Sequence, residues 1–316
     1  MSFSLAGEGN ITIDWGDGMR ETHEIGSNSQ FSHQYAGVSV RTVTITGKGI
    51  TKLTCMGFGS LTSLDVSKCT SLKELRCGGE FTSLDVSKNI ALTKLSCGSD
   101  KLTSLDVSKN IALTELILYQ CFNLTSLDVS KNIALTELRC GGKLTSLIVS
   151  NSPQLKKLSC SENQLTSLDV SGCPQLKELN CEKNQLTSWN ASNCPQLEKL
   201  YCRQNQLTSL DVSGCPQLKE LDCTENQLTN SALDDLFRTL PNNGGWIHFH
   251  SNPGADNCDR SILKIRVGTS NVLYIHRHVF FNWCVRLNHD FNKIKKISKI
   301  VWESFFFVCL RAKNFS

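Results

Sequence analysis

Apolar residues recur along the chain in the pattern L-x-x-L-x-Cys, and this pattern returns at a nearly fixed interval. Successive copies are 20–22 residues apart. A fixed period in this range is typical of a solenoid, in which each unit buries its apolar face only by stacking on its neighbours. Aligned on the last apolar position, the series has nine members: Cys55, Cys77, Cys97, Leu118, Cys140, Cys160, Cys181, Cys202 and Cys223.

Each unit has two similar halves. The segments "LTSLDVSGC" (165–173) and "LKELNCEKN" (176–184) both alternate apolar and polar residues before a turn residue. Alternation with a period of two predicts a short strand in each half. We therefore expect two parallel sheets along the solenoid, with eight or nine rungs spaced about 4.8 Å apart.

The turns after the cysteines differ between the two ends of the series. Asparagine follows at a constant position in the later units, where an inward side chain can hydrogen-bond the backbone of a buried turn: Asn163, Asn184, Asn205 and Asn226. The earlier units "CGGEF" and "CGGKL" are one residue shorter, and "LYQCFNL" is one residue longer. We expect local bulges in the amino-terminal half.

The motif L-x-x-L-x-C-x-x-N-x-L resembles the leucine-rich repeat, with cysteine at an inward leucine position. The clause "LTSLDVS" is similar to repeats of gut-bacterial surface leucine-rich-repeat proteins. The resemblance covers 51–237. It implies a curved solenoid that serves binding, usually at the cell surface, and it does not imply a particular ligand.

The two ends of the solenoid need caps, because end rungs expose apolar surface. The segments "ITIDWGDG", "FSHQYA" and "RTVTITG" predict strands around glycine turns, and they resemble part of a polycystic-kidney-disease-type β-sandwich. Asp14 and Asp17 favour a turn role over calcium binding, because the spacing of a calcium loop is absent.

At the other end, Ser231–Leu240 carries apolar residues at helical spacing, with Asn230 or Ser231 as its cap. The segment "GGWIHFHSNPG" predicts a last strand and turn, with His248 and His250 on one face. These two residues do not form a convincing metal site. We divide the chain into a β-rich cap (1–49), the solenoid (50–229), a carboxy-terminal cap (230–261) and a tail (262–316).

The 16 cysteines are interpreted mainly as small buried apolar residues. Neighbouring cysteines in parallel strands point the same way, which is a poor geometry for a disulfide, and no CxxC pair suggests zinc. A second set fills the opposite turn: Cys69, Cys173, Cys194 and Cys215. Other units place Asn89, Asn110, Asn132 or Ser152 there, which indicates a turn filler rather than a redox centre.

The tail differs in charge from the rest of the chain. Residues 262–316 contain 10 Lys/Arg and 2 Asp/Glu, so the preceding body has a net charge of −4 although the whole chain has +4. Proteins with similar repeats tend to continue here with Ala-Glu-Asn-Lys, whose codons read out of frame begin Leu-Lys-Ile-Arg, as in 263–266. Our hypothesis is a frameshifted tail. The alternative is a basic, aromatic segment that binds membrane or RNA.

The beginning of the chain carries no signal peptide, and Met1 falls just before a predicted strand. We expect a start further upstream, or a truncated copy of a longer gene. No run reaches the length of a membrane span. The resemblance implies an extracellular or cell-surface location, whereas many free thiols suit a reducing or anaerobic setting.

The variable outward positions beside the cysteines are the candidates for ligand binding. Tyrosine and arginine dominate binding hot spots, and the candidate face is Arg76, Ile117, Tyr119, Arg139, Tyr201, Arg203 and Asp222. The alternative is that these are ordinary surface residues. A neighbouring column mixes Glu and Lys and is expected to be a solvated face of low specificity.

The opposite sheet carries a column of aspartates: Asp65, Asp85, Asp106, Asp128, Asp169 and Asp211. Turn capping is the favoured interpretation of this column, and weak calcium binding is the alternative.

These features favour a non-enzymatic binding or adhesion module for a protein or glycan. The alternatives are a structural spacer or nonfunctional gene product and, less favoured, a membrane or RNA binder acting through its tail. No catalytic motif such as GxSxG, HExxH or a P-loop occurs. We expect a monomer with no cofactor, no metal and no nucleic-acid partner.

Overall fold

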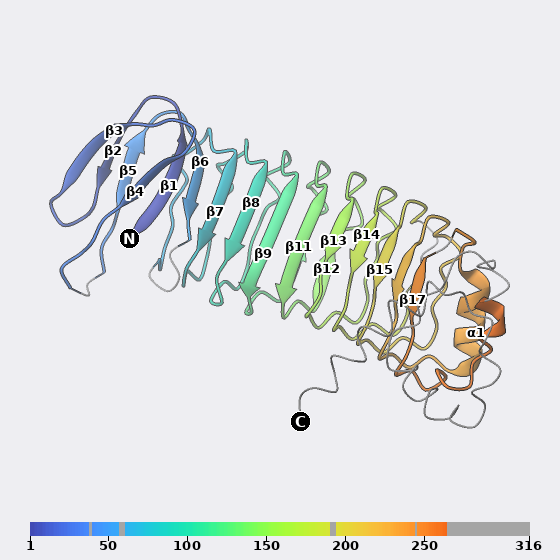
Figure 1. The fold of residues 1–316 in the computed structure, drawn as a ribbon. Coiled ribbons are helices and arrows are strands. Elements are labelled where there is room, and N and C mark those ends of the chain that lie inside the picture. The colour runs from blue at the N-terminus through green and yellow to red at the C-terminus, as the bar shows by residue number, and fades with distance from the viewer. Residues whose placement is uncertain (38–39, 57–60, 190–193, 244, 264–316) are drawn as a thin grey trace, which may run out of the picture. The chain divides into compact units, whose positions relative to one another are not determined.

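A column of parallel strands forms the main sheet of the protein. The computed structural model describes residues 1–37, 40–56, 61–189, 194–243 and 245–263, which belong to one compact unit. Figure 1 shows the strands side by side in the order β17-β16-β15-β14-β13-β11-β9-β8-β7-β6-β1-β4. The parallel strands are β6 (Ile50–Cys55), β7 (Glu74–Gly78), β8 (Lys94–Gly98), β9 (Glu115–Cys121), β11 (Glu137–Gly142), β13 (Lys157–Ser159), β14 (Glu178–Asn180), β15 (Lys199–Tyr201), β16 (Glu220–Asp222) and β17 (Trp246–His248).

The repeated leucines and cysteines lie in register across this sheet. Leu75 pairs with Leu95 and Cys77 with Cys97 on the neighbouring strand, and all four side chains are buried. The alternate residues face outward, as the period of two requires. The predicted rungs are confirmed, and β17 adds one more parallel strand beyond them.

The second sheet is shorter than predicted. Among the described residues, only β10 (Ser126–Asp128) and β12 (Ser146–Ile148) pair on the opposite side of the solenoid. Hydrogen bonds hold the turn that follows this segment: the Val66 carbonyl accepts from the amide of Cys69 at 2.9 Å and from Nδ2 of Asn89 at 3.0 Å.

The predicted turn roles on that side are confirmed. One Oδ of each aspartate in the column accepts the amide of the serine two residues on, at 2.8–2.9 Å. Asn89 and Cys173 occupy the same turn position in different coils. The Asn89 amide and the Cys173 thiol each donate to a valine carbonyl of the preceding coil. These residue types are therefore interchangeable turn fillers.

The asparagines of the later coils form a buried ladder, as predicted. Asn184 accepts from the Leu165 amide at 3.0 Å and donates through Nδ2 to the carbonyls of Cys160 (2.9 Å), Cys181 (3.1 Å) and Glu182 (3.2 Å). Each asparagine therefore joins its own turn to the preceding coil. The residue before each one has a left-handed backbone, with φ of 53–58°: Glu162, Lys183, Gln204, Glu225 and Ser251.

The amino-terminal coils contain the expected irregularities. The register between β9 and β11 shifts at Cys140/Gly142. Tyr119 lies across the strands β8 and β7, where its hydroxyl can donate to the Cys77 carbonyl oxygen or to the Met56 sulfur, each 3.0 Å away. Gly98 makes room for the tyrosine ring, since a β-carbon there would lie 2.0 Å from Cε2 of Tyr119.

Replacing Gly98 with alanine is expected to destabilise the protein by about 1–3 kcal/mol, because the added methyl displaces the Tyr119 ring from its contacts. Urea denaturation followed by circular dichroism measures this effect. In the Tyr119→Ala background the same substitution should cost under about 0.5 kcal/mol, because the clash is gone. An equal cost in both backgrounds would show that another contact requires the glycine.

The amino-terminal cap contains two β arrangements. The strand β1 (Ser2–Gly7) pairs antiparallel with β6 and with β4 (Ser29–Ser32) at the end of the main sheet. The strands β3 (Arg20–Glu24), β2 (Asn10–Asp14) and β5 (Thr44–Gly47) form a separate antiparallel sheet. The sequence pattern missed β1 and β3, and the likeness to a polycystic-kidney-disease-type domain stays a prediction.

The two aspartates of this cap stabilise turns. Asp14 accepts the Gly16 amide at 2.9 Å and pairs with Arg20, while Asp17 accepts the Met19 amide at 3.2 Å. The predicted turn role is therefore confirmed.

A helix covers the carboxy-terminal end of the solenoid. It is α1 (Asn230–Thr239), and its cap is Thr229, whose hydroxyl accepts from the Ala232 amide at 3.3 Å. The predicted caps Asn230 and Ser231 were therefore wrong by one or two positions. Leu233, Leu236 and Phe237 are buried. Among the described residues, no helix is long and apolar enough to cross a membrane.

The cysteines of the inward column are free and buried. Burial raises the pKa of Cys55 and of Cys140 to about 12. Such thiols stay protonated near neutral pH and are poor nucleophiles. The hypotheses about the tail concern a segment that, from residue 264 onward, lies outside the described residues.

Candidate functional site

The outward residues of the last four rungs form a continuous surface. The strands β14 to β17 pair in register, so that Asn180, Tyr201, Asp222 and His248 follow one another across the sheet. Two further rows flank this one, one before and one after it along each strand. We call the whole set the C-terminal strand face: Glu178, Asn180, Glu182, Lys199, Tyr201, Arg203, Glu220, Asp222, Thr224, Trp246, His248 and His250.

Aromatic rings occupy one end of the C-terminal strand face. The ring centroids of Tyr201 and Trp246 are 6.2 Å apart, and those of Trp246 and His248 are 4.4 Å apart. His250 continues the row, 6.3 Å from His248. Each of these side chains is half-buried, so it offers area to a partner without a large loss of rotamer freedom on binding.

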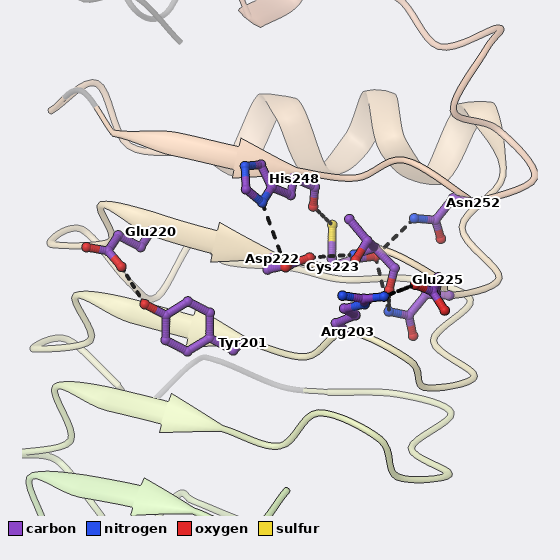
Figure 2. A network of polar contacts seen from close by, with 10 residues as sticks. Tyr201, Arg203, Glu220, Asp222, Cys223, Glu225, His248 and Asn252 are labelled. Carbon is purple, nitrogen blue, oxygen red and sulfur yellow. Dashed lines mark hydrogen bonds and ion pairs between the residues drawn. The ribbon is translucent and has the colours of Figure 1, made fainter. Parts of the chain in front are cut away.

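Polar contacts hold several of these side chains in place. Figure 2 shows the Tyr201 hydroxyl directed at the Glu220 carboxylate and Arg203 directed at Glu225. Lys199 also pairs with Glu220, at 2.9 Å. Asp222 accepts the Thr224 amide at 3.0 Å, and its second oxygen lies 3.8 Å from Nδ1 of His248. The face is therefore largely preorganised.

Two groups on the face are unfavourably placed in the free protein. Burial and, next, the negative charge of Asp222 raise the pKa of Glu182 above its usual value. The hydroxyl of Thr224 is buried, and it has no hydrogen-bond partner among the described residues. A buried polar group without a partner reduces stability.

The raised pKa of Glu182 predicts that Glu182→Gln stabilises the fold near pH 7. A carboxyl whose pKa is raised by folding contributes stability below its unfolded pKa of about 4.3 and loses it as pH rises through the folded value. The advantage of the variant should therefore grow as pH rises from about 3 to about 7. Urea denaturation across this range measures the difference from the unmodified protein.

Glu225→Gln is the matched control for this prediction. Hydrogen bonds from Gln204 and Arg203 lower the pKa of Glu225, so its carboxylate contributes stability above the unfolded pKa and loses it as pH falls. This variant should be less stable near neutral pH, with the difference fading in acid. The same sign of effect in both variants would contradict the assignment.

The structure brings together only some of the residues predicted from sequence. Tyr201, Arg203 and Asp222 lie within the C-terminal strand face. Arg76 and Arg139 lie on rungs nearer the amino terminus, and each bonds a glutamate of its own strand. Ile117 and Tyr119 are half-buried on β9, where Tyr119 bonds the backbone.

The sequence analysis missed Glu182, Thr224 and Trp246 as members of the face. A signal for Trp246 was present, since "WIHFHSN" repeats the spacing of "ELDCTEN" one rung earlier. Asn252 consequently extends the asparagine ladder by accepting from the Leu228 amide at 3.0 Å. Among the described residues, no group of three or more His, Cys, Asp or Glu has the geometry of a metal site.

The mixed column of Glu and Lys forms ion pairs between neighbouring rungs. Lys52 lies 3.2 Å from Glu74, and Lys94 lies 3.2 Å from Glu115. These exposed pairs add little stability individually. Most charges of this column are therefore already paired within the protein and are poorly placed to bind a partner.

Comparisons with known proteins identify the repeats. The model of the leucine-rich repeat family (two copies) matches residues 153–193 and 195–237. The functional domain of InlJ from Listeria monocytogenes, which includes a cysteine ladder, is 40% identical to this chain, with a TM-score of 0.55. The match covers 64% of this chain and 44% of that one, so this chain spans less than half the length of that relative.

Two other solved structures are similar at a lower level. YopM from Yersinia enterocolitica is 26% identical over 61% of this chain and 45% of that chain, with a TM-score of 0.37. Internalin C2 from Listeria monocytogenes is 20% identical over 59% of this chain and 77% of that chain, with a TM-score of 0.38. A search of curated proteins gave no match. The parallel coils, the repeat motif and the family match together show that the repeats of this chain form a leucine-rich-repeat solenoid.

Proposed function

We propose that this protein is a binding and adhesion module that recognises a macromolecular partner through the C-terminal strand face. The observation that carries this proposal is the in-register set of aromatic and charged side chains on four adjacent rungs. Tyrosine, tryptophan and arginine dominate binding energy in protein interfaces because they combine large area with directional donors. The favoured partner is a protein, and a glycan is the alternative.

Binding accounts for the arrangement of polar groups better than catalysis does. The thiols of the inward column face the core, and burial raises the pKa of Cys140 to about 12. The charged and aromatic groups instead spread over an open sheet surface. The proposal therefore includes no catalytic residue and no cofactor.

The amino-terminal rungs are proposed to act as a spacer. Arg76 and Arg139 are bonded to Glu74 and Glu137 on their own strands, and Tyr119 is bonded to the Cys77 carbonyl. Tyr201 and Arg203 are also bonded to glutamates, but their rungs adjoin the aromatic row of Trp246, His248 and His250. The spacer would hold the C-terminal strand face away from the amino-terminal cap, and the resemblance to surface proteins favours an extracellular or cell-surface location.

Protein and glycan arrays test the proposed function with three forms of the protein. A true partner should be bound by the unmodified chain and by Lys157→Ala, whose lysine is exposed and lies 3.8 Å from Glu178. Binding of that partner should fall at least about tenfold in the double variant Tyr201→Ala/Arg203→Ala. Equal losses in the two variants, or no loss in the double variant, would contradict a role for this face.

A further inference from the structure

The distribution of charge on the C-terminal strand face narrows the class of partner. The face carries four carboxylates, on Glu178, Glu182, Glu220 and Asp222, and two permanent cations, on Lys199 and Arg203. Both cations are engaged by other carboxylates: Lys199 bonds Glu220, and Arg203 bonds Glu225 through Nε at 3.0 Å. Burial and the charge of Asp222 outweigh the opposing charges of Arg203 and Lys183 and raise the pKa of Glu182, so its carboxylate is undercompensated on this surface.

The positions of these two carboxylates favour one binding spot. Glu182 follows β14 and Asp222 ends β16, so the strand β15 lies between them. The two negative charges repel each other, and the charge of Asp222 is one cause of the raised pKa of Glu182. A cation placed between like charges gains from both of them.

The Thr224 hydroxyl is an independent sign of an unsatisfied site. It lies two residues after Asp222 on the same outward side of the rung, it is 1% exposed, and it has no hydrogen-bond partner within the described part of the chain. A hydroxyl is an acceptor as well as a donor. An N–H group from a ligand would give this oxygen the partner that the free protein lacks.

Aromatic rings border the same spot. Tyr201 lies on β15 in register with Asn180 and Asp222, next to the row that carries Glu182 and Arg203, and the ring centroids of Trp246 and Tyr201 are 6.2 Å apart. Ring faces attract guanidinium and ammonium groups in addition to their apolar contact. Carboxylates beside rings match a group that is both planar and cationic.

We propose that the C-terminal strand face binds a basic segment of a protein partner, with an arginine side chain received between Glu182 and Asp222 beside Tyr201. This inference rests on the proposed function and specifies its ligand class. A guanidinium has five N–H donors in a planar fork, which suits two carboxylates and the Thr224 hydroxyl together. A neutral glycan would leave the carboxylates uncompensated, and it is one outcome of the test.

A peptide of alternating arginine and glycine, acetylated, amidated and labelled with fluorescein, is the probe. Fluorescence anisotropy with the full chain should show saturable binding that weakens as salt is added. The matched peptide with citrulline in place of arginine keeps the size and removes the charge, and it should bind at least about tenfold more weakly. Equal affinity for the two peptides would overturn the inference.

Variants of the protein locate the binding. Glu182→Gln/Asp222→Asn should weaken the arginine peptide at least about tenfold, whereas Glu80→Gln/Asp235→Asn should not. The control removes the same charge from exposed carboxylates that pair with Lys101 and Arg238, outside this face. Equal weakening by both double variants would show that only net charge matters, and this result would overturn the site.

Thr224→Val separates a role of this hydroxyl in binding from a role in stability. The valine removes an unpaired buried hydroxyl at similar volume, so the melting temperature should stay the same or rise. Affinity for the arginine peptide should nevertheless fall about threefold to tenfold. An unchanged affinity would remove Thr224 from the site.

The same variants separate this inference from the function on which it rests. A partner from the arrays that is lost in Tyr201→Ala/Arg203→Ala but retained by Glu182→Gln/Asp222→Asn would support the binding face and overturn the cationic ligand class. A partner that is insensitive to both double variants would contradict the proposed function itself.

Discussion

Replacing Asn184 with alanine is expected to destabilise the protein by about 3–5 kcal/mol, measured by urea denaturation. The side chain makes four hydrogen bonds to backbone groups of two coils, and it is buried. Alanine leaves the Leu165 amide without its partner and removes one of the two asparagine donors from the carbonyls of Cys160 and Cys181. Buried backbone groups that lose their partners carry the full cost of desolvation.

Asn151→Ala is the matched control. Asn151 is exposed and makes one hydrogen bond, from Nδ2 to the Ser130 carbonyl at 3.0 Å. Its replacement should change stability by less than about 1 kcal/mol. Similar costs for the two substitutions would show that the buried ladder does not hold neighbouring coils together.

Phe237→Ala is expected to cost about 3–5 kcal/mol, because it opens a cavity under the carboxy-terminal cap. The ring is fully buried on α1 and meets Phe249 edge-on, with centroids 5.1 Å apart. In a solenoid each coil contacts only its neighbours, so the damage should concentrate at the capped end. Hydrogen exchange should show faster opening of β16 and β17 than of β7 and β8.

The exposed ring of Phe122 provides the comparison for this variant. Phe122 is 47% exposed, so Phe122→Ala should cost less than about 1 kcal/mol. Uniform acceleration of exchange along the whole sheet in Phe237→Ala would contradict the local, coil-by-coil stability that the architecture implies.

Sequence periodicity predicted the repeated part of the fold well for a physical reason. Each Leu and Cys of the motif must point into the core at the same height in every coil, so spacing alone determines the register of pairs such as Leu75 and Leu95. The asparagine ladder followed from the need to satisfy buried turn groups. The second sheet was over-predicted because alternation identifies the inward side chains but does not determine the backbone pairing, which the described residues make on that side as strands only between β10 and β12.

The candidate site was predicted only in part, because it depends on which outward side chains lie beside one another on neighbouring rungs. Arg76 and Tyr201 look equivalent as outward residues in sequence, and each bonds a glutamate, but only Tyr201 of the two also lies beside Trp246. Thr224 is an ordinary residue in the sequence, and only the three-dimensional arrangement shows its hydroxyl buried and unpaired among the described residues. The register of β16 with β17 places Trp246 beside Glu220 and His248 beside Asp222.

Site-specific photocrosslinking to a partner recovered from the arrays tests most directly whether the C-terminal strand face makes the contact. A benzophenone amino acid is placed either at Tyr201, on the C-terminal strand face, or at Asp169, on the opposite side of the solenoid. A covalent adduct with the partner is expected from the position of Tyr201 and not from that of Asp169. An adduct from Asp169 alone, or equal yields from both positions, would contradict recognition through the C-terminal strand face.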